Sequence, residues 1–205
     1  MEFEEKERRA KIVVDDSEGI RPVCEAFYIH SIIYSARRCL NSFDRYDCLK
    51  DGAGDPESLI SILQEAVGHA AALSRYFWPS KNSKKGKYQK VLKESRGAKL
   101  LHAFNLDNDS PLYNRDLRNA WEHFDERLDS YLLEAESGFF HPDCLSGSHE
   151  LVDNNPSAHI FKLLDQDAEC LVLMGDKYFF TLIREEVQRI LSKAESFDNR
   201  GTRIS

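Results

Sequence analysis

The sequence predicts a mainly α-helical fold: an antiparallel bundle of helices, followed by a β-hairpin and a final helix. Apolar residues recur every three or four positions through most of the chain, which is the spacing of a buried helix face. Pro residues stand where several of these stretches begin, at the positions that suit a first helical turn. Near the end of the chain, two short apolar runs are joined by a polar turn, as in a β-hairpin.

Composition narrows the class of protein. The chain has 205 residues, of which 41% are hydrophobic and 31% charged, so it can bury a core and is not a disordered chain. Its net charge of −7 argues against a broad basic surface for duplex DNA. No run of 18 apolar residues exists, and seven of the first nine residues are charged. We therefore expect a cytoplasmic protein that neither spans a membrane nor carries a secretion signal.

Three regions are expected along the chain. Residues 1–20 are highly charged and have little periodicity, which predicts a mobile lead-in. Residues 21–136 are expected to form the helical bundle. Residues 137–205 are expected to hold an irregular connection, the hairpin and the last helix, packed on the same domain.

Helix-starting and helix-ending residues divide the bundle into four helices. Pro22 begins the first, Asp55-Pro56 caps and begins the second, and Pro79 ends it. Ser110-Pro111 is expected to start the fourth. The expected bounds are about 22–49, 55–78, 88–104 and 111–135.

The remainder of the chain differs in amino-acid composition. Residues 137–158 contain many Gly, Pro, Ser and Asn residues and are expected to be irregular. Strands are expected at 160–164 and 169–174, with the polar turn between them. A final amphipathic helix follows at about 180–194, and the tail from residue 199 is expected to be loose.

The fourth helix carries the chemically distinctive residues. At about 100° per residue its apolar residues gather on one side, which is expected to face the core. Arg118, Asn119, Glu122, His123 and Glu126 fall on the opposite side, so they face water, a ligand or another subunit. The residues expected to face the core are Leu117, Trp121, Phe124, Leu128, Tyr131 and Leu132.

Within the polar set, residues four apart can touch, which pairs Arg118 with Glu122 and Asn119 with His123. The planar guanidinium of Arg suits a phosphate group. Imidazole accepts or donates a proton near neutral pH, and Asn can fix its orientation. Attack of a ribose 2′-hydroxyl on its own phosphodiester needs such a set: a base, a cation for the developing charge, and an acid for the leaving oxygen.

The run Arg118-Asn119-Ala-Trp-Glu-His123 resembles the signature of HEPN-domain proteins, in which a polar residue directly follows Arg and four to six residues separate Arg from His. The resemblance covers roughly residues 20–136. The wider pattern also resembles a group of small bacterial HEPN-like proteins: a helix ends Ser74-Arg-Tyr-Phe-Trp-Pro79, and Arg118-Asn through His123-Phe-Asp-Glu-Arg127 follows later. The resemblance implies a metal-independent endoribonuclease of the toxin or phage-defence kind. Arg118 would then bind the scissile phosphate, His123 act as general base or acid, Asn119 orient it, and Glu122 support Arg118.

Partners follow from the same resemblance. Family members dimerise so that two motif helices form one cleft, which implies a homodimer through the Arg118 and His123 face. RNA is the expected substrate, and an antitoxin or regulatory protein is a candidate partner. Contacts with the RNA strand are assigned to a basic loop, although a solvated loop without a partner is the alternative. The loop residues are Lys81, Lys84, Lys85 and Lys87.

Neither a metal nor a cofactor is expected, since the five cysteines are widely spaced and form no CxxC pair. Two other functions stay open. One is a catalytically silent HEPN-like module that dimerises or binds nucleotides or a partner protein. The other is a structural helical protein in which Arg118 and His123 simply face solvent.

Overall fold

The structure is a computed structural model that describes residues 2–52, 54–80, 86–135, 137–155 and 157–204. It is mainly helical and includes a small sheet and a C-terminal helix, as the sequence predicts. The chain divides into two compact units that combine segments far apart in the sequence. The first unit comprises residues 1–38, 69–113 and 186–205, and the second comprises residues 39–68 and 114–185. This division does not follow the predicted boundaries at residues 20 and 136.

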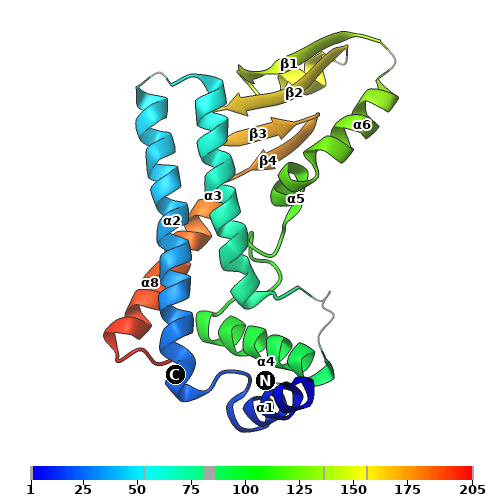
Figure 1. Cartoon of the computed structure of the whole chain (residues 1–205). Coiled ribbons are helices and arrows are strands. Elements are labelled where there is room, and N and C mark those ends of the chain that lie inside the picture. Colours follow the sequence, from blue (N-terminus) through cyan, green and yellow to red (C-terminus); the bar gives the residue numbers. More distant parts are fainter. Residues whose placement is uncertain (1, 53, 81–85, 136, 156, 205) are drawn as a thin grey trace. The chain divides into compact units, whose positions relative to one another are not determined.

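The helices of the first unit confirm most of the predicted bundle bounds. Helices α2, α3 and α8 each contribute residues to both units, and a short 3-10 turn at Pro22–Cys24 leads into α2. Side chains from three of the helices meet in an aromatic core: the ring of Phe104 lies 5.2 Å from Phe77 and 5.3 Å from Phe197. The helices are α1 (Phe3–Ser17), α2 (Glu25–Asp51), α3 (Pro56–Phe77), α4 (Lys87–Phe104) and α8 (Thr181–Asn199) (Figure 1).

Residues 1–20 are not the mobile lead-in that the sequence predicts. Helix α1 packs on α4 and buries Ala10. The carboxylate of Glu7 accepts hydrogen bonds from the backbone N–H groups of Tyr88 (2.9 Å) and Gln89 (3.2 Å), which caps the start of α4. Burial opposes the charge of Glu7, but these hydrogen bonds hold its pKa below the ordinary value. This long-range cap fixes α1 on α4, which the hydrophobic pattern of α1 alone does not indicate.

The tail from residue 199, which the sequence predicts to be loose, is held in place at Ile204, which is only 6% exposed. The buried carboxylate of Glu25 accepts a hydrogen bond from the Ile204 N–H (3.2 Å) and another from Lys99 Nζ (3.0 Å). Since these partners come from three segments of the first unit, one buried ion pair ties the tail to the helices.

In the second unit, the end of α2 and the start of α3 run antiparallel. The Cys39 thiol donates a hydrogen bond to the Ala66 carbonyl (3.3 Å), and Arg45 Nη1 lies 2.8 Å from Glu65 Oε2. The predicted cap is present, since Asp55 Oδ1 accepts the N–H of Ser58 (3.0 Å).

A mixed sheet forms the other part of the second unit, in the order β1-β2-β3-β4. Strand β1 is parallel to β2, and the other neighbours are antiparallel. The predicted hairpin is confirmed as β2 and β3, with β3 buried along its whole length. The strands are β1 (Phe139–Ser146), β2 (Ala158–Asp165), β3 (Cys170–Leu173) and β4 (Asp176–Phe179).

Strand β1 lies where the sequence predicts irregular chain, and strand β4 occupies residues for which no helix or strand is predicted. Strand β1 is mostly exposed and contains Pro142 beside a register shift, so it lacks the apolar run of a buried strand. Its connection to β2 includes a short helix, α7 (Leu151–Asn154). Strand β4 follows a two-residue loop in which Met174 (φ 48°) and Gly175 (φ 87°) are both left-handed, the backbone that a tight hairpin requires.

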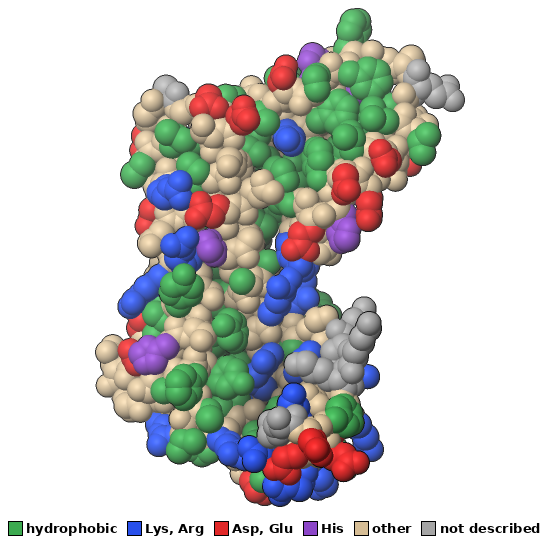
Figure 2. All heavy atoms as spheres, viewed as in Figure 1, with side chains coloured by type: hydrophobic (Ala, Val, Ile, Leu, Met, Phe, Trp, Pro, Cys, Tyr) green, Lys and Arg blue, Asp and Glu red, His purple; other side chains and the backbone are tan. Residues whose placement is uncertain are grey.

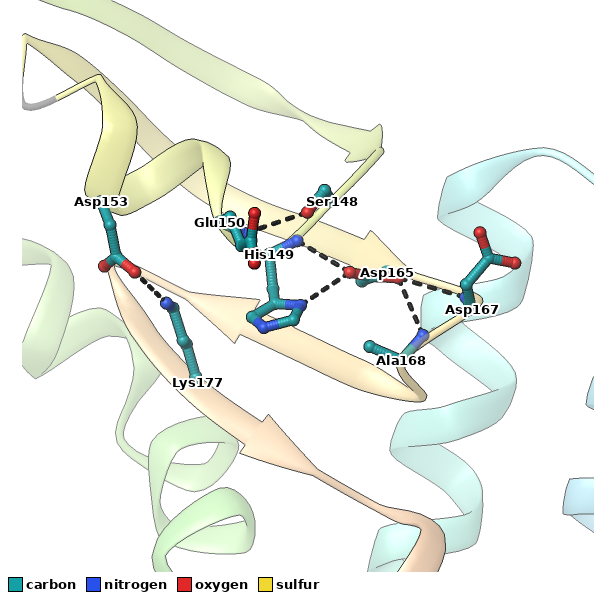
Figure 3. Close-up of polar contacts among 8 residues, drawn as sticks. All are labelled: Ser148, His149, Glu150, Asp153, Asp165, Asp167, Ala168 and Lys177. Carbon is teal, nitrogen blue, oxygen red and sulfur yellow. Dashed lines mark hydrogen bonds and ion pairs between the residues drawn. The ribbon is translucent and has the colours of Figure 1, made fainter.

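The turn between β2 and β3 is organised by the buried side chain of Asp165 (Figure 3). Its Oδ1 accepts the N–H groups of Asp167 (3.1 Å) and Ala168 (2.9 Å). Its Oδ2 accepts both the backbone N–H (2.9 Å) and the ring Nδ1 (2.7 Å) of His149, which belongs to the connection between β1 and β2. One carboxylate therefore fixes a turn and a distant loop together.

The predicted fourth helix is wrong in two respects. Pro111 lies in a turn, and the helix begins only at Asp116, whose N–H is bonded to Asn114 Oδ1 (2.7 Å). The helix is also interrupted at His123, which separates α5 (Asp116–Glu122) from α6 (Phe124–Glu134). Leu132, expected in the core, is 46% exposed, and α6 has no buried residue among those described.

Candidate functional site

The candidate site lies at the break between α5 and α6, in the second unit. At the break, His123 has φ −116° and ψ 34°, outside the helical range. Backbone hydrogen bonds continue on both sides, from His123 N–H to the Asn119 carbonyl (3.0 Å) and from Arg127 N–H to the His123 carbonyl (3.1 Å). Helix α5 is anchored by Leu117 and Ala120, both buried. The break therefore presents His123 from a backbone that is held at both ends.

Arg118 is paired along α5 with Glu122. Its Nε lies 2.9 Å from Glu122 Oε1, and its Nη2 contacts Glu122 Oε2, so the guanidinium and the carboxylate face each other in a two-point pair. The Arg118 side chain is only 18% exposed, whereas that of Glu122 is 49% exposed. The predicted contact between Arg118 and Glu122 is present, and the carboxylate engages the edge of the guanidinium formed by Nε and Nη2.

His123 is the more accessible of the two predicted catalytic residues, with 57% of its side chain exposed. Its Nδ1 lies 3.3 Å from Glu126 Oε2, so the second ring nitrogen is left for another partner. No hydrogen bond joins the side chains of Asn119 and His123, both of which the structure describes. The predicted positions off the core are confirmed for Asn119, Glu122 and His123, all exposed, while Arg118 is half-buried.

Asn119 and His123 line a surface hollow of about 550 Å³, and Arg118 is not among the residues around it. Figure 1 shows α5 beside strand β4, which supplies the other wall. Two cations on this hollow, Arg127 and Lys177, are not among the site residues that the sequence predicts. The hollow is lined by Asp116, Asn119, Ala120, His123, Arg127, Asp176, Lys177 and Tyr178.

Arg127 connects α6 to β4. Its Nη1 lies 2.7 Å from the Tyr178 hydroxyl, and its Nη2 contacts the carboxylate of Asp176. Partial burial opposes the charge, but these two neighbours hold the pKa of Arg127 above its ordinary value. Arg127 lies one helical turn after His123, which is a signal that the sequence offered, whereas nothing local pointed to β4.

The predicted basic loop is only partly described. Lys81, Lys84 and Lys85 lie outside the described residues. Lys87 begins α4 in the first unit, is exposed, and has its ammonium 5.7 Å from the centre of the Tyr88 ring.

Within the described residues, no group of three or more His, Cys, Asp or Glu side chains is arranged to hold a metal ion. No helix in that part of the chain is long and apolar enough to cross a membrane. The chain matches no family model, and a search of curated proteins and solved structures finds no similar protein.

Proposed function

We propose that this protein is a metal-independent endoribonuclease of the HEPN type and that it acts as a dimer. The main support is the exposed imidazole of His123, held at a helix break on a hollow that also presents Asn119 and two cations. His123 takes the proton of a ribose 2′-hydroxyl, whose oxygen then attacks the adjacent phosphorus. The bond from phosphorus to O5′ breaks, and a second acid protonates O5′. The products are a 2′,3′-cyclic phosphate and a 5′-hydroxyl.

A dimer would supply the groups that one chain lacks. The only His on the hollow described above is His123, so a second His123 from a partner would provide the acid. Within one chain Glu122 engages Nε and Nη2 of Arg118, so the scissile phosphate would have to displace this carboxylate to take the same two donors. The exposed polar face of α5 is the surface through which two copies would meet.

The alternative is a catalytically silent module that dimerises or binds a partner. One observation favours it: both arginines near the break are already paired, Arg118 with Glu122 and Arg127 with Asp176. An arginine held in this way contributes little to phosphate binding unless its carboxylate moves away.

Cleavage of labelled RNA in EDTA separates the two functions. The wild type and a His102→Ala control, which alters an exposed histidine of the first unit, are expected to cleave. His123→Ala and Arg118→Ala are each expected to lose at least about a hundredfold in rate. Equal rates for His123→Ala and the control would refute the assigned site.

Mixing the wild type with an excess of His123→Ala tests the composite cleft. A mixed dimer has one intact His123 and so lacks either the base or the acid that the proposed mechanism takes from the two copies. If the cleft combines residues from two copies, the activity of the wild type falls as His123→Ala exchanges into its dimers. If that activity is unchanged although mixed dimers form, one chain works alone.

A further inference from the structure

The two units carry opposite charge. The first unit contains 20 Lys and Arg against 14 Asp and Glu, and the second contains 8 against 21. Their formal net charges are therefore +6 and −13, although the whole chain is only −7. The hollow at His123 lies in the acidic unit, where the summed charge repels a polyanion.

In the acidic unit most Lys and Arg side chains already form ion pairs. Five of its eight Lys and Arg residues form ion pairs within the unit, so they offer little free charge to a phosphate. The pairs are Arg45 with Glu65, Arg118 with Glu122, Arg127 with Asp176, Lys177 with Asp153, and Arg184 with Asp47.

Helix α4 of the first unit differs in this respect. Between Lys87 and Phe104 the chain has five Lys and Arg residues but one acidic residue, Glu94. Lys99 is paired with Glu25, and Arg96 donates to the Arg75 carbonyl (3.2 Å). The remaining three are Lys87, Lys90 and Lys93.

Lys87 and Lys90 are exposed and Lys93 is half-buried. No carboxylate of the described residues forms an ion pair with any of these three lysines. They follow one another at intervals of three residues, about 4.5 Å apart along the helix axis. Figure 2 shows Lys and Arg side chains around α1 and α4, beside a group of acidic side chains. Glu7, one of the acids close to α4, is engaged in capping that helix.

We infer that Lys87, Lys90 and Lys93 form a binding surface for the phosphate backbone of single-stranded RNA. The choice of RNA rests on the proposed function, and the place of binding rests on the charge of the first unit. Phosphate contacts of this kind supply affinity without sequence preference and weaken as salt displaces them. Binding and chemistry are thus assigned to different units of the chain.

The test measures binding of a fluorescein-labelled 20-nucleotide oligo(U) by fluorescence anisotropy, between 0.05 and 0.5 M NaCl, roughly the range in which such contacts respond to salt. The protein is the full chain with His123→Ala, so that the RNA stays intact. The test variant adds Lys87→Gln, Lys90→Gln and Lys93→Gln. The control instead adds three changes of equal charge in the first unit, at arginines that are already ion-paired. These are Arg8→Gln, Arg9→Gln and Arg37→Gln.

Three lost phosphate contacts are expected to weaken binding at least about tenfold at 0.1 M salt and to reduce the slope of log affinity against log salt by about 2. The control is expected to change affinity less than about threefold. An equal loss in both variants would overturn the inference, because net charge alone would then explain binding. Equal affinity for poly-glutamate would overturn it too, since the surface would then fit an acidic protein.

The outcome is independent of catalysis. If the lysine variant loses affinity but the wild type never cleaves RNA, the binding surface stands and the nuclease does not. If cleavage depends on His123 but binding ignores the three lysines, the nuclease stands and this surface does not.

Discussion

Replacing Asp165 with Asn is expected to destabilise the second unit by about 2.5 kcal/mol at pH 7. Burial of this carboxylate opposes its charge, but hydrogen bonds from Ala168 and His149 outweigh burial and lower the pKa from 3.8 to about 2 (Figure 3). A difference of nearly two pKa units between the unfolded and folded states corresponds to that free energy. Asn keeps an acceptor for the turn but turns an amide or an uncharged oxygen toward His149.

The pH dependence has a definite sign. Because the pKa of Asp165 is lower in the folded state, its stabilisation is present above about pH 4 and is lost as the pH falls toward 2. The wild type and Asp165→Asn should therefore differ by about 2.5 kcal/mol at pH 7 and converge near pH 2. Asp167→Asn is the matched control, since Asp167 lies in the same turn but is exposed; it should cost less than about 0.5 kcal/mol.

Urea unfolding followed by tryptophan fluorescence measures this effect. The chain has two tryptophans, Trp78 in the first unit and Trp121 in the second, so a Trp78→Phe background reports the second unit alone. A loss of the same size at pH 7 and pH 2 would refute the reasoning, because it would show that the charge of Asp165 is not what stabilises the fold.

Other predictions concern the helices and the tail. Gly97→Ala should destabilise the first unit by about 2 kcal/mol, because the added Cβ would lie 2.6 Å from the Phe77 carbonyl oxygen. Gly68→Ala should instead stabilise the protein by about 0.5 kcal/mol, because nothing lies within 4 Å of its added Cβ. Thermal unfolding compares the two. Glu25→Gln should destabilise the first unit by about 3 kcal/mol, because it leaves the half-buried Lys99 without its carboxylate. It should also expose the tail to carboxypeptidase. Unchanged protection of the tail from digestion would contradict the role of Glu25. His123→Ala should unfold within about 0.5 kcal/mol of wild type in urea.

The elements that the sequence predicted well are those whose signals are local. The three first bundle helices begin and end close to their expected positions because Pro22, Asp55-Pro56 and Pro79 act on neighbouring backbone. Helix α1 was missed because its anchors, Ala10 and Glu7, act through α4, far along the chain. Strand β1 was missed since its place depends on pairing with β2.

In the candidate site, too, the residues with local signals were predicted and those that depend on distant pairing were not. Helical angles alone indicated that Asn119, Glu122 and His123 avoid the core. Of the two cations on the hollow, Lys177 could not be foreseen, because it comes from a strand that the sequence does not reveal, whereas Arg127 lies one helical turn after His123. The charge of each unit was hidden for a related reason: the units combine distant segments, so no window of sequence has the charge of a unit.

The catalytic role proposed for His123 is to assist attack by a 2′-hydroxyl. The most direct measurement incubates the wild type and His123→Ala, in EDTA, with an RNA oligonucleotide and with the same sequence containing 2′-deoxy sugars, and identifies the product ends by mass. Fragments ending in a 2′,3′-cyclic phosphate are expected from the RNA and the wild type only. Cleavage of the 2′-deoxy strand, or cyclic phosphate ends from His123→Ala, would contradict that role.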